Sequence, residues 1–158
     1  MDAVTYPDES VSSAIASYFV PVQINTQDGS DNTKVTVRRF RQVWTPDLRI
    51  LDGDGVELYR WNGYLPATEF LPQLLAGRAQ ALLRSDRGDE AADAYTDILR
   101  RFPTSFVAPE VAYFTAVSRY RLSHEASDLL DNWEHVQRRY PMSEWRTKQS
   151  FIEKQQPS

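Results

Sequence analysis

The stretch Val43–Gly63, VWTPDLRILDGDGVELYRWNG, carries the strongest local signals in the chain. An apolar run from Leu48 to Leu51 and a second run from Val56 to Trp61 flank the turn DGDG. Asp-Gly pairs between such runs predict a β-hairpin, because glycine accepts the positive φ of tight turns. Pro46 stands directly before the first strand. It is either an ordinary strand-start proline or a cis proline in a tight turn.

The residues before this hairpin predict three short elements. Pro7, followed by two acidic residues and by apolar residues at helical spacing, predicts a helix of about two and a half turns. Val20, Val22 and Ile24 alternate, which predicts a half-buried strand over Val20–Ile24. After a polar turn, the residues up to Val43 predict a short helix.

The residues after Gly63 are helical and repeat themselves. DAYTDILRRFPTS at Asp93–Ser105 aligns with DNWEHVQRRYPMS at Asp131–Ser143, at an offset of 131 − 93 = 38 residues. A period in this range predicts stacked helix pairs, here closed by Pro103 and Pro141. Arginine pairs precede both prolines, and there they complement the helix dipole. A third cluster, Arg38 to Arg41, predicts a solvated helix face rather than an anion site.

Composition excludes several classes of function. The chain has 158 residues, a net charge of −4 and no sustained basic stripe, so neither nucleic acid nor a membrane is an expected partner. No apolar run approaches the roughly 20 residues of a membrane helix, and the absence of a signal segment favours the cytoplasm. We predict no cofactor and no metal site, because His124 and His135 lie far apart on polar helical backgrounds.

The chain contains no cysteine. A thiolate is required for disulfide exchange, so this polypeptide has no residue that could catalyse it. An alternative is a hydrolase built on Asp52, Asp54 and Glu57, but acids at a hairpin turn are usually solvated and no His or Lys base is near them in sequence. The same turn lacks the ligand spacing of an EF-hand calcium loop. We therefore predict no catalytic residues.

The first half of the chain resembles the C-terminal two thirds of thioredoxin-fold proteins. The residues that carry the resemblance are Thr5, Tyr6, Pro7, Asp8, Val11, Phe19, Val20, Pro21, Val22, Phe40, Val43, Thr45, Pro46, Leu48, Asp52, Gly55, Gly63 and Phe70. In that family a Thr-cis-Pro pair precedes the hairpin, so the resemblance implies a cis Thr45–Pro46 bond. It also implies an α/β thioredoxin-like fold.

The chain departs from the family at its redox motif. The family's Cys-x-x-Cys would fall just before Met1, together with the central strand of the sheet, so the thioredoxin-like part is expected to be incomplete. Val20–Ile24 is then expected to pair directly beside Leu48–Leu51; otherwise exposed strand edges would invite a homodimer. Two origins fit: a truncated thiol-disulfide oxidoreductase or redox-linked chaperone, or a cysteine-free relative that works by binding.

The second half resembles tetratricopeptide (TPR) repeats. Gly88-Asp89-Glu90-Ala91-Ala92, followed by Tyr95, Ile98 and Pro103, looks like the second helix of such a repeat. The first helices lack the family's usual tryptophan and glycine, and 38 exceeds the family's usual length. A helical extension without a ligand groove is the alternative.

These observations predict residues 1–76 as an N-terminally truncated thioredoxin-like domain and 77–158 as all-α TPR-like helical hairpins. The predicted function is a redox-inactive module that binds a protein or an extended peptide. Thioredoxin-fold relatives hold substrate backbone around the Thr-Pro pair, so the candidate peptide-binding residues are Trp44, Thr45, Pro46, Trp61 and Tyr64. Core packing is the alternative role of the tryptophans.

Overall fold

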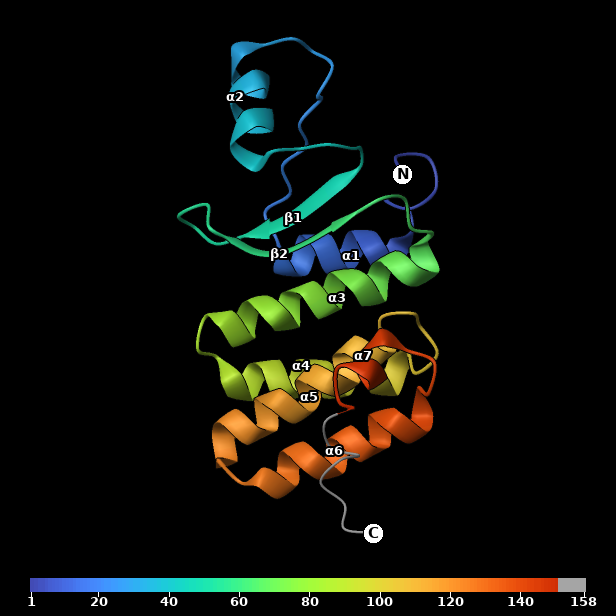
Figure 1. Cartoon of the computed structure of the whole chain (residues 1–158). Helices are drawn as coiled ribbons and strands as arrows, with labels where there is room; N and C mark the ends of the chain where they lie inside the picture. The colour runs from blue at the N-terminus through green and yellow to red at the C-terminus, as the bar shows by residue number, and fades with distance from the viewer. Residues whose placement is uncertain (151–158) are drawn as a thin grey trace. The chain divides into compact units, whose positions relative to one another are not determined.

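The computed structural model describes residues 1–150. The chain divides into two compact units, Met1–Leu71 and Pro72–Ser158, which we describe separately. The first unit contains α1 (Glu9–Tyr18), α2 (Asp31–Phe40), β1 (Asp47–Leu51) and β2 (Glu57–Asn62). The boundary falls inside α3 (Ala67–Arg84), and the second unit continues with α4 (Gly88–Arg101), α5 (Ala108–Ser123), α6 (Ala126–Arg139) and α7 (Glu144–Thr147) (Figure 1).

The two helices of the first unit begin at side-chain caps. Asp8 Oδ1 accepts hydrogen bonds from the backbone N–H groups of Ser10 (2.9 Å) and Val11 (3.1 Å) at the start of α1. Ser30 Oγ accepts from the N–H of Thr33 at the start of α2. Each cap satisfies an N–H group that has no partner within the helix, which is why these polar residues begin the helices.

Val20–Ile24 does not form a strand, so this prediction was wrong. The sheet among the described residues contains β1 and β2 alone, and the expected pairing of Val20–Ile24 beside Leu48–Leu51 is absent. Val20 is 90% exposed and Val22 is 79% exposed. A strand exists through the ladder of hydrogen bonds to its neighbour, and alternation of apolar residues does not supply that neighbour.

The predicted hairpin is present. β1 and β2 pair antiparallel, with Leu48 opposite Trp61 and Ile50 opposite Tyr59. In the turn, the N–H of Gly55 donates to Asp52 O (3.1 Å), and Gly55 has φ +77°, a conformation that side chains disfavour. Asp52 Oδ1 accepts from the N–H groups of Asp54 and Val56, both at 2.9 Å. The turn acid therefore organises the turn backbone.

A small aromatic core lies in the first unit. The ring of Phe70 meets Tyr6 and Trp61 edge-on, each at a centroid distance of 5.7 Å. Thr5, fully buried, donates its hydroxyl to Leu65 O (2.8 Å). These contacts join the N-terminal residues and the hairpin to the segment that leads into α3.

The second unit contains the internal repeat that the sequence predicted. α4 and α6 have equal lengths and begin and end 38 residues apart, at Gly88–Arg101 and Ala126–Arg139. Their last turns have the same geometry: Phe102 has φ −131° and ψ 52°, and Tyr140 has φ −129° and ψ 57°. Matching local sequences, Arg-Arg-Phe-Pro and Arg-Arg-Tyr-Pro, thus produce nearly the same geometry at the two helix ends.

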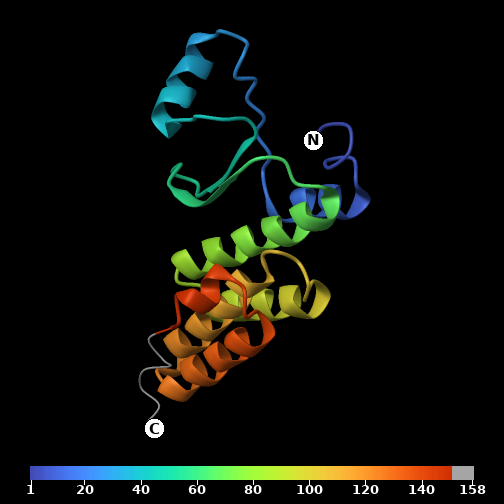
Figure 2. The same ribbon diagram turned by 45° about the vertical axis from the view of Figure 1, so that its right-hand side comes forward.

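The repeat packs against itself. Tyr140 donates its hydroxyl to Pro103 O (3.0 Å), and Arg121 Nη1 donates to Leu83 O (3.1 Å), so equivalent helix ends are tied together. In both views α4, α5 and α6 lie side by side (Figure 1 and Figure 2). Tyr113 is the centre of an aromatic cluster, with ring centroids 5.3 Å from Trp133 and 4.9 Å from Trp145. This cluster fastens α7 to α5 and α6.

Candidate functional site

The site begins where α2 ends. Arg41 adopts the left-handed conformation (φ 47°, ψ 46°), its N–H donates to Arg38 O (3.2 Å), and the N–H of Gln42 donates to Val37 O (3.1 Å). This pair of hydrogen bonds is the Schellman arrangement, which ends a helix and turns the chain away from its axis. It directs residues 42–46 across the unit toward the start of β1.

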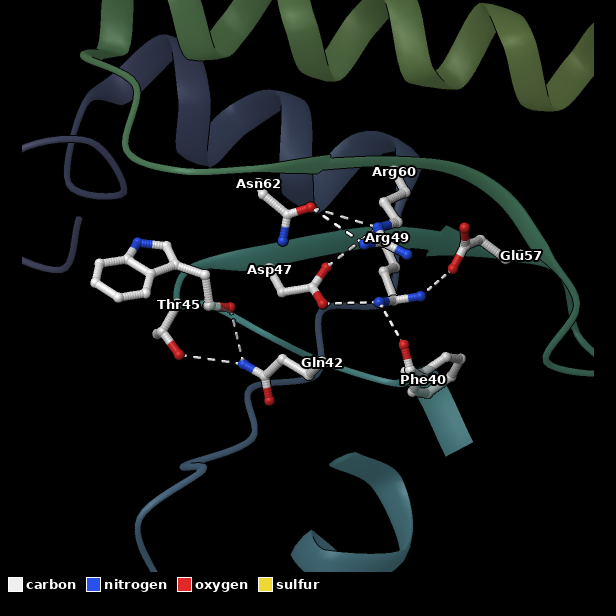
Figure 3. Close-up of polar contacts among 9 residues, drawn as sticks. Phe40, Gln42, Thr45, Asp47, Arg49, Glu57, Arg60 and Asn62 are labelled. Atoms are coloured by element: carbon white, nitrogen blue, oxygen red, sulfur yellow. Dashed lines mark hydrogen bonds and ion pairs between the residues drawn. The ribbon is translucent and has the colours of Figure 1, made fainter. Parts of the chain in front are cut away.

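The side chain of Gln42 holds this loop in shape. Its Nε2 donates to Trp44 O (3.2 Å) and to Thr45 Oγ1 (3.1 Å) (Figure 3). One amide group therefore fixes two consecutive residues relative to the end of α2. Further along, Pro46 O accepts from the N–H of Gly63 (2.9 Å), which ties the loop to the end of β2.

The Thr45–Pro46 peptide bond is cis. Of the two alternatives for this proline, the cis bond implied by the family resemblance is therefore confirmed.

An open groove lies beside this loop, with a volume of about 340 Å³. It is shallow and largely open to solvent. Two valines and the indole of Trp44 supply its apolar surface. Its lining residues are Thr26, Val37, Gln42, Val43, Trp44 and Thr45.

Thr45 presents an unused backbone pair at this groove. Within residues 1–150, its N–H and its C=O make no hydrogen bond, whereas the carbonyls on either side, Trp44 O and Pro46 O, are both occupied. Such a pair can bond to one residue of an added extended chain, as in strand addition at a sheet edge. Trp44 beside it is 70% exposed.

An ion network supports the loop from the side of the hairpin. Arg49 donates to Asp47 Oδ2 (2.7 Å), to Phe40 O (2.9 Å) and to the carboxylate of Glu57, and its guanidinium lies 4.8 Å from the centre of the Phe40 ring (Figure 3). Burial disfavours the charged form of Arg49, but the hydrogen bonds and charges of Asp47 and Glu57 outweigh it and raise the pKa of Arg49. This cation therefore stays charged at every physiological pH.

The network links α2 to β1 at the point where the groove begins. Asp47, which directly follows Pro46, has a side chain only 4% exposed, and its Oδ1 lies 3.9 Å from Arg60 Nε. Because Phe40 O is the acceptor at the end of α2, Arg49 holds both ends of the loop 41–46. The geometry of the groove thus depends on a buried ion pair outside it.

The five residues predicted as peptide-binding candidates separate into two groups. Trp44 and Thr45 line the groove, while Pro46, Trp61 and Tyr64 are not among its lining residues. Trp61 packs its ring against Phe70 and Tyr59, the core alternative that the sequence left open. Tyr64 is exposed beyond the end of β2.

Sequence reasoning missed four residues of the groove. Val43 stands exposed beside Trp44, and two consecutive apolar residues between a helix and a proline are a signal that could have found it. Val37 and Gln42 follow only from the end of α2, and Thr26 only from the return of the preceding loop. No sequence pattern indicates those three.

The structure assigns other roles to the residues of the rejected alternatives. Asp52 caps the hairpin turn, and Glu57 pairs with Arg49. His124 and His135 are both exposed. Among residues 1–150, there is no group of three or more acidic, histidine or cysteine side chains placed to bind a metal ion, and no helix long and apolar enough to cross a membrane.

The comparison with protein families bears on the first unit. Residues 1–78 match a family model described as a thioredoxin-like domain. This part of the chain is therefore similar to thioredoxin-like domains. The match covers the caps, the cis proline, the hairpin and the first turns of α3. No family match supports the TPR resemblance of the helices that follow.

Comparisons with curated proteins and with solved structures found no match. What the thioredoxin-like domain does in this chain must therefore be argued from its own residues.

Proposed function

We propose that the thioredoxin-like unit is a binding module without redox activity, which holds an extended peptide or protein segment at Thr45. The observation that carries the proposal is that the N–H and C=O of Thr45 have no partner among residues 1–150, next to the exposed Trp44. Backbone hydrogen bonds give an extended ligand affinity, and an adjacent apolar pocket gives it a preference for one side chain.

The chemistry of the chain favours binding over catalysis. Redox exchange needs a thiolate, and the 158 residues contain no cysteine. The carboxylates of Asp47 and Glu57 are engaged in ion pairs and that of Asp52 in turn hydrogen bonds, so these acids serve the structure. What remains exposed at the groove is an aromatic ring, two valines and backbone polar groups, a combination suited to recognition.

For the second unit we propose a TPR-like scaffold. The 38-residue period, the equal helices α4 and α6 and the matching ends at Phe102 and Tyr140 support a repeat architecture. In such arrays each helix pair buries a face on its neighbour, and the remaining surface is free to bind protein. The two units would then both serve recognition.

Selection of peptides from a random displayed library, with the full chain as bait, tests the binding proposal. A peptide so selected should lose at least about tenfold in affinity for the Trp44→Ala variant, because a truncated aromatic anchor typically costs more than 1 kcal/mol. Met142→Ala is the matched control, since Met142 is 95% exposed in the other unit. Equal affinities of the peptide for wild type and Trp44→Ala would show that the groove is not the peptide-binding site.

A second candidate is that this chain is part of a longer thiol-disulfide oxidoreductase. The observation in its favour is the apolar segment Val20–Ile24, which is exposed and has no strand partner among residues 1–150. An in-frame Cys-x-x-Cys upstream of codon 1, preceded by an apolar strand, would support it. A stop codon in that place would contradict it.

A third candidate is a homodimer in which the exposed segment Val20–Ile24 takes part in strand pairing between two copies of the chain. Sedimentation of the full chain over a range of concentrations tests it. A Val20→Lys, Val22→Lys variant should then be monomeric where wild type is dimeric. A wild-type chain that stays monomeric would exclude this arrangement.

A further inference from the structure

Two exposed cations that adjoin groove residues in the sequence have no partner in the described part of the chain. Among residues 1–150, the guanidinium groups of Arg38 and Arg41 have no hydrogen bond or ion pair, and both side chains are exposed. Arg39 between them is occupied, because its Nη2 donates to Gly55 O (2.8 Å). Two of the three arginines in this cluster are therefore available to a ligand.

These two arginines adjoin residues that line the groove. Arg38 follows Val37 directly, and Arg41 directly precedes Gln42. The end of α2 thus carries one charged residue next to Val37 and one next to Gln42 in the sequence.

Charge along the first unit is segregated. Residues 1–33 contain no lysine or arginine, whereas residues 34–43 contain four cations and no acidic residue. Lys34 is neutralised by Asp31, with Nζ and Oδ1 3.2 Å apart. The remaining positive charge belongs to Arg38, Arg39 and Arg41, in a chain whose net charge is −4. The cluster is a local feature and does not follow from the overall composition.

We propose that the ligand of this groove is an acidic, extended peptide, with an apolar side chain against Trp44 and carboxylates that pair with Arg38 and Arg41. The inference rests on the proposed function and narrows it to one class of partner. Carboxylate and guanidinium form charge-assisted hydrogen bonds in a matching planar geometry. Such pairs at the rim of a site select partners and speed encounter more than they raise affinity.

A purely structural role for the cluster is the competing account. Cations near a helix C-terminus complement the macrodipole, and α2 ends at Phe40. That account serves Arg38, which lies inside the last turn. It serves Arg41 less well, because Arg41 occupies a left-handed position (φ 47°) that glycine fills at lower cost. A large charged residue at that position suggests a use beyond ending the helix.

Three fluorescent peptides of equal length and equal apolar content test the proposal. One carries two glutamates beside a central leucine, one carries two glutamines and one carries two lysines. Fluorescence anisotropy with the full chain at low salt should rank them acidic, neutral, basic. We expect the acidic peptide to bind about fivefold to tenfold more tightly than the neutral one, since two exposed ion pairs contribute modestly. The difference should shrink as salt screens the charges.

Variants locate the charges responsible. Arg38→Gln with Arg41→Gln should remove the difference between acidic and neutral peptides and leave the neutral peptide's affinity unchanged. Arg138→Gln with Arg139→Gln is the matched control, because these residues precede an aromatic residue at the end of α6 as Arg38 and Arg39 do at the end of α2. The control should keep the preference for the acidic peptide.

The outcomes separate this inference from the proposed function. If all three peptides bind equally and Trp44→Ala weakens them all, the groove binds peptide but the acidic preference is wrong. If the preference survives Arg38→Gln with Arg41→Gln, other cations cause it and the inference is also wrong. If no peptide binds, both proposals fail. If wild type forms a dimer and the Trp44→Ala variant is monomeric, a second copy of the chain occupies the groove. That result would overturn the proposal of a peptide ligand.

Discussion

The two units of this chain bury their apolar residues to different extents. In the thioredoxin-like unit the buried apolar side chains are Val11, Ala14, Ile50, Phe70 and Leu71, whereas the helical unit buries a continuous set from α3 to α6. The thioredoxin-like unit also exposes most of the large apolar side chains that reach solvent, among them Val20, Val22 and Trp44.

This difference follows from how each architecture hides apolar surface. Repeated helices supply each other's neighbours, so one helix pair covers the next. A two-stranded hairpin has few neighbours of its own, and isolated hairpins are marginally stable in water. The thioredoxin-like unit therefore depends on a buried ion network and a small aromatic core, and it leaves apolar surface available for a partner.

The largest loss of stability in the thioredoxin-like unit should come from Arg49→Met. The change leaves the carboxylate of Asp47 buried with Arg60 alone near it, 3.9 Å away, and breaking one side of a buried pair costs about 3–5 kcal/mol. Hydrogen exchange resolved by peptide should show faster exchange in β1 and β2 with α4 to α6 unchanged. The double variant Arg49→Met with Asp47→Leu should recover part of the loss; a double variant less stable than Arg49→Met would show that the charges are not the cause.

A loss of similar size in the helical unit should come from packing instead. Trp133→Ala removes a ring that is 6% exposed and stacks on Tyr113 at 5.3 Å, at a cost of about 3–5 kcal/mol. Urea unfolding followed by circular dichroism measures it. Trp44→Ala, an equal truncation at an exposed position, is the control and should change the free energy of unfolding by less than about 0.5 kcal/mol.

A single buried hydrogen bond should have a smaller effect. Tyr95 donates its hydroxyl to Gln80 Oε1 (2.7 Å) in the interior of the helical unit. Tyr95→Phe keeps the ring and takes this donor from the Gln80 oxygen, so we expect a loss of about 1–3 kcal/mol in the free energy of unfolding. A thermal melt that matches wild type would show that the Gln80 oxygen finds another donor.

The smallest effect on stability is expected at the exposed apolar segment. Val20→Ser with Val22→Ser should leave the free energy of unfolding within about 0.5 kcal/mol of wild type, because both side chains already face solvent. Chemical denaturation tests this. A loss of 2 kcal/mol or more would mean that the segment is packed, and the contrast between the two units would be weaker than the structure indicates.

Local signals made much of the fold predictable. The DGDG turn with its flanking runs produced the hairpin, because its geometry is determined by residues within one turn. The 38-residue repeat was predictable because the two helices end in matching residues, Arg-Arg-Phe-Pro and Arg-Arg-Tyr-Pro. Val20–Ile24 was wrongly predicted as a strand because a strand depends on a neighbour, and alternation at Val20, Val22 and Ile24 contains no information about one.

Of the residues that line the groove, the sequence indicated only Trp44 and Thr45. Trp44 and Thr45 were named from the motif around Pro46, but the partners that shape their groove come from the end of α2 and from Thr26. These partners come close to Trp44 and Thr45 only through the Schellman turn at Arg41 and through Arg49, which binds both ends of the loop 41–46. Trp61, which pairs opposite Leu48, packs its ring against Phe70, a contact that depends on the fold and not on the motif around Pro46.

Hydrogen exchange of the Thr45 amide, read by NMR with and without a peptide selected from the library, tests the central claim most directly. The account predicts that this N–H, which has no partner in the described part of the chain, exchanges rapidly without peptide and slows by at least about tenfold when the peptide binds. Protection of amides elsewhere in the chain, with exchange at Thr45 unchanged by saturating peptide, would contradict it.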